Sequence, residues 1–217
     1  MNDLRPTSLR EQVVEHIRQA IVEGQLKPGD HMVEVQLTEQ LGISRTPLRE
    51  ALILLEREGL VETIRHKGTY VRSFSVNDVD DIFSMRTTLE NFAGERIIHE
   101  LGTSDYSKLE RLIDTQQKFI NTNDFKRVRA TDMDFHRYLV VRSGHPHLLR
   151  SWSEIVAQIA ALLYKRAETN PQYDEAKVIT DHQRILAAYK DRDIDALRQA
   201  NTDINTRVAG ECRKALS

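Results

Sequence analysis

The chain has 217 residues, of which 40% are hydrophobic, and a formal net charge of −2. This length allows two domains with ample cores. The absence of an apolar N-terminal segment or a long apolar run argues against secretion and membrane insertion, so we expect a cytoplasmic location. The single Cys212 argues against a disulfide framework or a cysteine-ligated zinc site.

The first predicted element is a helix over residues 8–23, which packs under the unit that follows it. Apolar residues recur along one face of this helix at positions Leu9, Val13, Ile17, Ala20 and Ile21. The dipeptide Pro28-Gly29 ends the connection to the next element.

Residues 34–60 are the most informative part of the chain, because they predict a helix, a tight turn and a second helix. Val35, Leu37 and Leu41 form an apolar face until Gly42 stops the first helix, and Ile43 packs back across the turn. This arrangement is typical of a helix-turn-helix unit that enters DNA.

The second helix of this unit is predicted to begin at Ser44, whose hydroxyl can accept a hydrogen bond from a free backbone N–H. Arg45, Thr46 and Arg49 then lie on the outward side, at the end that a recognition helix presents to base edges. The inward side carries a stripe at helical spacing, formed by Leu48, Ala51, Leu52 and Leu55.

A two-stranded wing is predicted after Gly59, with strands near residues 60–64 and 69–72. The turn between them carries His66, Lys67 and Gly68. Lys67 supplies a charge that attracts any DNA sequence, and Gly68 lets the backbone approach a phosphate or a groove closely.

The sequence SRTPLREAL at residues 44–52, with LEREGLV after it and Pro28-Gly29 before it, resembles the winged-helix signature of the GntR family of bacterial transcription regulators. The resemblance covers about the first 75 residues. It implies that DNA is contacted by Ser44, Arg45, Thr46, Arg49, His66, Lys67 and Gly68. The alternative is that Arg45 and Arg49 are ordinary solvated surface charges.

Positive charge in this region is local. Residues 44–72 hold six Lys and Arg against four Glu, so we expect modest nonspecific affinity with strong salt dependence. Sequence-specific binding then needs two half-sites, which predicts a homodimer on a palindromic operator.

Residues 76–217 predict a second domain, an all-α antiparallel bundle of about six helices, so that the protein as a whole is mainly α. Residues 73–78 form a short polar linker before it. The predicted helices span residues 79–100, 106–122, 124–142, 147–168, 173–190 and 194–215.

Polar residues interrupt the apolar stripes of this bundle. Asp132 and His136 lie one turn apart among Phe125, Val128, Phe135 and Leu139, while His182 and Arg86 occupy similar positions on their own helices. Burying four such groups without partners is costly, so they require partners or a cavity.

Four segments of the second domain resemble the FCD ligand-binding domain of FadR-type GntR regulators: MRTTLE at residues 85–90, DMDFH at 132–136, SGHPHL at 143–148 and DHQRILAAYKDRD at 181–193. The resemblance implies a divalent metal held by Asp132, His136, His182 and a fourth histidine. That fourth position falls on Ile204, which cannot bind a metal. Three ligands with water can still hold zinc, manganese or nickel, although more weakly.

Three interpretations of the predicted cavity remain open. The first is a three-ligand metal site at Asp132, His136 and His182. In the second, the same residues bind an effector without a metal, and in the third they form an internal hydrogen-bond network. By resemblance, Arg86 faces an effector carboxylate, whereas a salt bridge to Glu90 four residues on is the alternative.

We therefore predict a ligand-responsive transcription regulator, most simply a repressor, that binds operator DNA and senses a small carboxylate. A DNA-binding protein with a purely structural helical domain is the alternative. An enzyme is not expected, because the sequence contains no HExxH, GxSxG, phosphate-loop or dinucleotide-binding motif.

Overall fold

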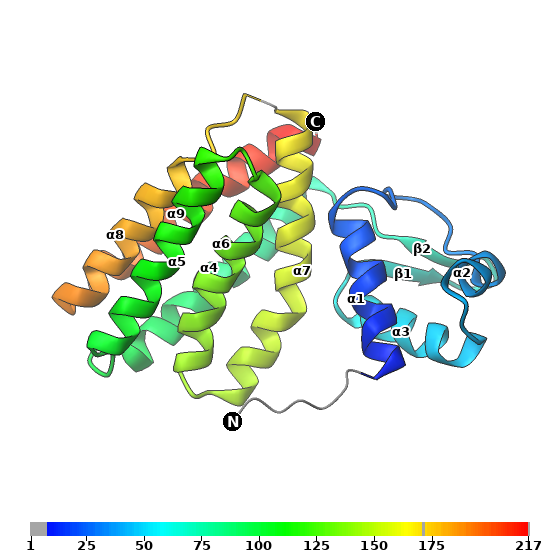
Figure 1. Ribbon diagram of the computed structural model, residues 1–217, viewed down its shortest axis with the longest axis horizontal. Helices are drawn as coiled ribbons and strands as arrows, with labels where there is room; N and C mark the ends of the chain where they lie inside the picture. The colour runs from blue at the N-terminus through cyan, green and yellow to red at the C-terminus, as the bar shows by residue number, and fades with distance from the viewer. Residues whose placement is uncertain (1–7, 171, 217) are drawn as a thin grey trace. The chain divides into compact units, whose positions relative to one another are not determined.

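The computed structural model describes residues 8–170 and 172–216. The chain divides into two compact units, the first ending at Ser75 and the second beginning at Val76. Figure 1 shows a small winged unit, coloured blue to cyan, and a helical unit, coloured from green to red.

The first unit is a three-helix winged fold. Helix α1 (Leu9–Val22) packs against α3 (Arg45–Arg57), and α2 (Glu34–Leu41) ends at Gly42, whose φ is 64°. Ser8 caps α1, because its side chain accepts a hydrogen bond from Glu11 N while the Glu11 carboxylate accepts one from Ser8 N. The stripe predicted on α3 is buried, whereas Val35, on the predicted apolar face of α2, is 47% exposed.

The wing consists of β1 (Val61–Ile64) and β2 (Gly68–Val71), which pair antiparallel with Val61 opposite Val71 and Ile64 opposite Gly68. His31, on the connection before α2, stacks its ring on Tyr70 at 4.7 Å between centroids. A Cβ at Gly68 would lie 2.5 Å from His31 Nε2, so this close packing requires glycine there.

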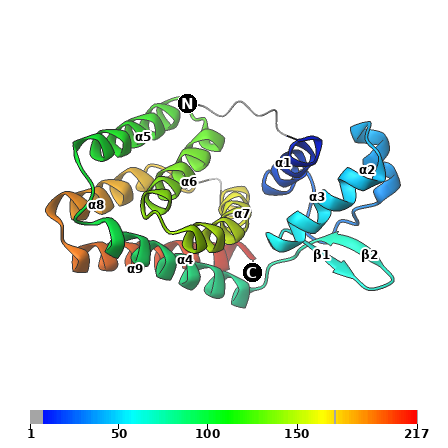
Figure 2. The same ribbon diagram turned by 90° about the horizontal axis from the view of Figure 1, so that it is seen from below.

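Over residues 76–170 and 172–216, the second unit is a bundle of six helices, as predicted. Figure 2 shows how these helices are arranged. Helix α4 packs against α6, α7 and α9, so its side chains reach the interior of the bundle. The bounds of the helices are α4 Val76–Ile97, α5 Thr103–Asn121, α6 Phe125–Arg142, α7 Pro146–Thr169, α8 Lys177–Asp191 and α9 Ile194–Leu216. Part of the core is a cluster of Ala93, Val140, Leu148 and Trp152.

Three predicted helix starts differ from the structure by three residues or more. Helix α4 begins at Val76, so the linker is shorter than expected, and α5 begins at Thr103 instead of at residue 106. Helix α8 begins at Lys177 instead of at residue 173. The latter difference arises because Asp174 Oδ1 accepts a hydrogen bond from Ala176 N, while Glu175 turns into the interior. Within the described part of the chain, no helix combines the length and apolar character needed to cross a membrane.

Candidate effector and metal site

The residues predicted to contact DNA lie on the surface of the first unit. Ser44, Arg45, Thr46 and Arg49 are exposed at the start of α3, and His66 and Lys67 are exposed at the tip of the wing. Ser44 occupies the capping position but its side chain makes no hydrogen bond to the helix, so the predicted hydroxyl cap was wrong.

Arg49 has a partner that the motif did not indicate. Glu34 at the start of α2 accepts hydrogen bonds from Arg49 Nε at 2.9 and 3.0 Å, and Arg49 Nη2 lies 2.9 Å from Glu34 Oε2. The guanidinium is therefore oriented before any DNA arrives, although its side chain remains 61% exposed.

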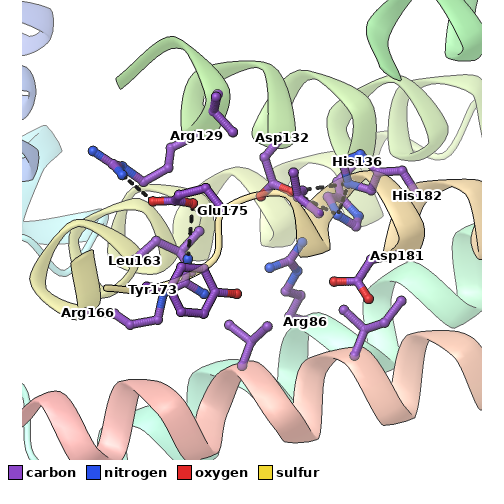
Figure 3. Close-up of a pocket in the computed structure, with 14 residues that line it drawn as sticks. Arg86, Arg129, Asp132, His136, Leu163, Arg166, Tyr173, Glu175, Asp181 and His182 are labelled. Atoms are coloured by element: carbon purple, nitrogen blue, oxygen red, sulfur yellow. Dashed lines mark hydrogen bonds and ion pairs between the residues drawn. The ribbon is translucent and has the colours of Figure 1, made fainter. Parts of the chain in front are cut away.

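In the second unit, the structure brings together the side chains of Asp132, His136 and His182. Asp132 and His136 share one face of α6, and His182 comes from α8. One ligand atom from each lies within 4.8 Å of the others, and all three residues are buried. Asp132 Oδ1 is 3.1 Å from His182 Nε2 and 3.9 Å from His136 Nε2, and the two Nε2 atoms are 3.3 Å apart (Figure 3).

Neighbouring residues determine which imidazole nitrogens carry protons. Gln116 on α5 donates its amide N–H to Val128 O at 3.4 Å, so its Oε1 accepts a hydrogen bond from His182 Nδ1 at 2.7 Å. Likewise, the Glu90 carboxylate on α4 accepts from His136 Nδ1 at 3.1 Å. In the neutral imidazoles both Nε2 atoms then present lone pairs toward each other and toward Asp132.

The cluster is therefore short of positive charge. Burial lowers the pKa of His182 despite its contact with Asp132, so an imidazolium is disfavoured there. Burial opposes ionisation of Asp132, but His182, His136 and Arg86 lower its pKa, so the carboxylate is ionised. Beside the neutral imidazole of His182, the anions Asp132 and Glu90 face the cation Arg86. A divalent cation bound by the two Nε2 atoms and Asp132 suits this donor set.

Arg86 forms the salt bridge to Glu90 that the sequence offered as the alternative. Its Nε donates to Glu90 Oε1 at 2.9 Å, and the residue is only 3% exposed. Although burial disfavours its charge, the carboxylates of Glu90 and Asp132 raise the pKa of Arg86. Among the described residues, no hydrogen bond involves its terminal nitrogens, and Figure 3 shows the side chain extending toward Asp132.

These residues line a cavity of about 40 Å³, which also contacts α7, α8, α9 and the α7–α8 connection. At about 10–15 Å³ for each water, this space holds about three waters. Ile204 lines the cavity, so an aliphatic side chain occupies the wall where the family resemblance expected a histidine. The adjacent Asn205 is not among the residues that line the cavity, and its Nδ2 donates to Thr87 Oγ1 at 3.0 Å.

Sequence reasoning did not find several residues of this site. Gln116 is completely buried, yet its helix reads as an ordinary amphipathic segment with polar residues throughout. Trp152 is 1% exposed and donates from Nε1 to Glu90 Oε1 at 3.4 Å. The only sequence signal for such partners is the requirement that buried histidines be hydrogen-bonded, which does not say by which residue.

Comparisons with known proteins agree with both units. Residues 9–71 match the family model described as bacterial regulatory proteins, gntR family, and residues 81–206 match the FCD domain. An uncharacterized HTH-type transcriptional regulator of Bacillus subtilis (strain 168), YdhC, is 31% identical over 203 residues, which cover 90% of this chain and 87% of that protein.

Two further comparisons have lower sequence identity. The gluconate operon transcriptional repressor of Bacillus licheniformis is 26% identical over 88% of this chain and 82% of its own. The solved structure of E. coli McbR/YncC has a TM-score of 0.81 at 24% identity, covering 95% of this chain and 98% of that chain, which shows the same fold. From the two matched domains and the YdhC relationship, this chain is a transcription regulator of the GntR family with an FCD domain.

Proposed function

We propose that this GntR-family regulator is a cytoplasmic, homodimeric repressor whose helical domain senses a small organic acid beside a divalent metal. One observation carries this proposal. Three electron-pair donors, His136 Nε2, His182 Nε2 and Asp132 Oδ1, come together at the wall of a cavity, and Arg86 lines the same cavity. Buried lone pairs without a proton between them favour a cation.

In this proposal Asp132, His136 and His182 hold zinc, manganese or nickel, and a water or an effector oxygen completes the coordination. The metal supplies a positive charge that attracts a carboxylate. Glu90 and Gln116 keep the two imidazoles in the required tautomer. The free terminal nitrogens of Arg86 bind the effector carboxylate in two-point fashion.

The DNA-binding domain contacts an operator through the start of α3 and the wing. Arg45, Thr46 and Arg49 reach base edges, Ser44 and Lys67 contact phosphates, and His66 and Gly68 bring the wing close to the groove. Two copies of the domain then bind a palindromic operator.

Repression that an effector relieves is the simplest form of regulation for this arrangement, and the gluconate operon relative is a repressor by its name. Linkage requires reciprocity: an effector that weakens DNA binding must itself bind more weakly to the DNA-bound protein, by the same factor. Titrations in both directions test this. Independent binding of effector and operator would contradict the switch.

The experiment that tests the metal is elemental analysis of protein purified without chelator or histidine tag, compared with His182→Ala. We expect metal close to one per chain that is lost in the variant. His147→Ala is the control, because His147 is exposed at the start of α7. Metal-free wild-type protein would instead favour the second candidate, direct binding of the acid by Arg86 and the histidines.

The position of Ile204 gives a second test. Ile204→His adds an imidazole to the cavity wall, so we expect tighter metal binding in competition with a chelator. Unchanged affinity would mean that residue 204 does not face the metal. Val208→His, one turn further along the same wall, is the matched control.

A further inference from the structure

The part of the cavity away from the imidazoles is lined by two arginines that the family resemblance did not indicate. Arg129 on α6 and Arg166 on α7 both face the carboxylate of Glu175 (Figure 3). Arg129 Nη1 lies 2.6 Å from Glu175 Oε1, and Arg166 Nη2 lies 3.6 Å from Glu175 Oε2. The same cavity is thus lined by Arg86 and by this second pair of arginines.

Arg166 is the less well satisfied of these two arginines. It is 5% exposed, and its Nε has no hydrogen-bond partner in the described part of the chain. Its contacts with Glu175 and with Glu211, at 3.6 and 3.3 Å, are longer than the 2.7–2.9 Å typical of a charged pair. The ring of Tyr173 covers one face of the guanidinium, with 3.8 Å from its carbon to the ring centroid.

The carboxylates around Arg166 differ in how firmly the fold holds them. Glu211 belongs to α9, whereas Glu175 belongs to the connection between Thr169 and Lys177, outside either helix. Burial raises the pKa of Glu175 even though Arg129 and Arg166 act in the opposite direction. Of these two carboxylates, Glu175 is therefore the one that can more easily move away from Arg166.

The ion pairs around Arg166 show which charge would be left unpaired if the Glu175 carboxylate moved away. Arg129, Arg166 and Arg207 balance Glu175, Glu211 and Asp181, since Arg207 pairs with both Asp181 and Glu211. Removing Glu175 gives an excess of one positive charge beside the cavity. A second carboxylate would neutralise it.

We propose that Arg129 and Arg166 form a second anion subsite, that the effector is a small diacid, and that Glu175 occupies this subsite until the diacid displaces it. This inference rests on the proposed function and specifies its effector class. The present cavity of about 40 Å³ is too small for a diacid of four to six carbons, so the connection carrying Tyr173 and Glu175 must move outward on binding. That movement both enlarges the cavity and frees the arginines.

The test is calorimetric titration of the metal-loaded protein with acids of equal chain length. Succinate, glutarate and adipate are compared with butyrate, pentanoate and hexanoate. We expect at least one diacid to bind at least about tenfold more tightly than its monoacid, because it gains a second charge-assisted contact. Equal affinities for every pair would overturn this inference alone, whereas no binding of any acid would overturn it together with the proposed acid sensor.

Two variants test the residues. Arg166→Gln should abolish the preference for the diacid, so that each diacid binds no more tightly than its monoacid. Glu175→Gln should strengthen diacid binding several-fold, because the internal competitor has lost its charge. Glu168→Gln, at an exposed glutamate that pairs with Lys165 near the end of α7, is the matched control.

Metal content gives an independent reading of these variants. We expect Glu175→Gln to retain the metal of the wild type. Loss of metal would identify Glu175 as a metal ligand and overturn its role as a stand-in for the effector. Weaker diacid binding by Glu175→Gln would overturn it as well.

Discussion

The two domains place the side chains proposed to bind DNA and effector in opposite environments. In the winged domain, Arg45, Arg49 and Lys67 are exposed and come from one short stretch of the chain. In the helical domain, Arg86, Asp132 and His182 are buried and come from α4, α6 and α8. The exposed charges of the winged domain are accessible to a large polyanion, whereas each buried charge of the helical domain needs a partner inside the bundle.

This difference predicts different consequences of mutation. Removing a charge from an exposed surface changes binding but has little effect on stability. Removing one from the buried network leaves its partner uncompensated, so stability and ligand binding change together. The predictions below use this contrast, in order of decreasing effect.

The largest expected effect is that of Glu90→Gln. Glu90 is 6% exposed and contacts Arg86, His136 and Trp152, so the substitution leaves a buried guanidinium without its carboxylate. We expect a loss of about 3–5 kcal/mol in the free energy of unfolding, measured with urea on chelator-treated protein. Glu95→Gln on the same helix removes an exposed pair with Arg198 and should cost less than about 1 kcal/mol. Equal losses would remove the contrast between the two environments.

Lowering the pH should remove the stabilisation that Glu90 gives through Arg86 and His136 in the wild-type protein. Burial acts to raise the pKa of Glu90, but Arg86 and His136 outweigh burial and lower this pKa from 4.5 to about 2. A carboxyl whose folded pKa is depressed stabilises the protein above its unfolded pKa. We therefore expect a contribution on the order of 3 kcal/mol, complete above pH 4.5 and lost as the pH falls toward 2. The stability difference between wild type and Glu90→Gln should shrink over that range, and a constant difference would contradict the assignment.

Gln116→Leu tests whether the imidazole tautomers matter. Loss of the acceptor for His182 Nδ1 should weaken metal binding by about 10–100-fold, measured by competition with a chelator. Gln117→Leu is a close control, since Gln117 is exposed on the same helix and bonds only to Asn121. Similar metal affinities for the two variants would show that Gln116 has only a packing role.

On the exposed side, Arg49→Ala should reduce operator affinity by about 1–3 kcal/mol if Arg49 reads a base, with no comparable change in the free energy of unfolding. Lys67→Ala should weaken binding to all sequences uniformly and reduce the salt slope by about one. Fluorescence anisotropy with specific and random duplexes separates these outcomes. A uniform loss for Arg49→Ala would assign Arg49 to a phosphate.

Glu34→Gln tests whether Glu34 positions Arg49 for reading bases, and its expected effect is the smallest. It removes the charge that orients Arg49 while retaining an amide of similar shape. We expect less discrimination between specific and random duplexes, together with an unchanged or higher nonspecific affinity because one negative charge is gone. Unchanged discrimination would mean that Glu34 does not position Arg49 for reading.

Much of the architecture was predictable from the sequence because its signals are local. Gly42, Ser44 and the stripe from Leu48 to Leu55 identify a helix-turn-helix, and the six helices of the bundle follow from periodicity and breaks. Predictions were wrong where a tertiary contact prevailed, as at the start of α8, where Glu175 pairs with Arg129 across 46 positions instead of continuing a helical segment.

By itself, the sequence determined the winged motif, the helical class of the second domain and the inward positions of Arg86, Asp132, His136 and His182, because each depends on spacing within one helix or turn. Only the tertiary structure decided their partners. Gln116 meets His182 across 66 positions of the chain, Trp152 meets Glu90 across 62, and Arg129 meets Glu175 across 46. Such contacts depend on how helices pack, and a buried polar group requires a partner without specifying where in the chain that partner lies.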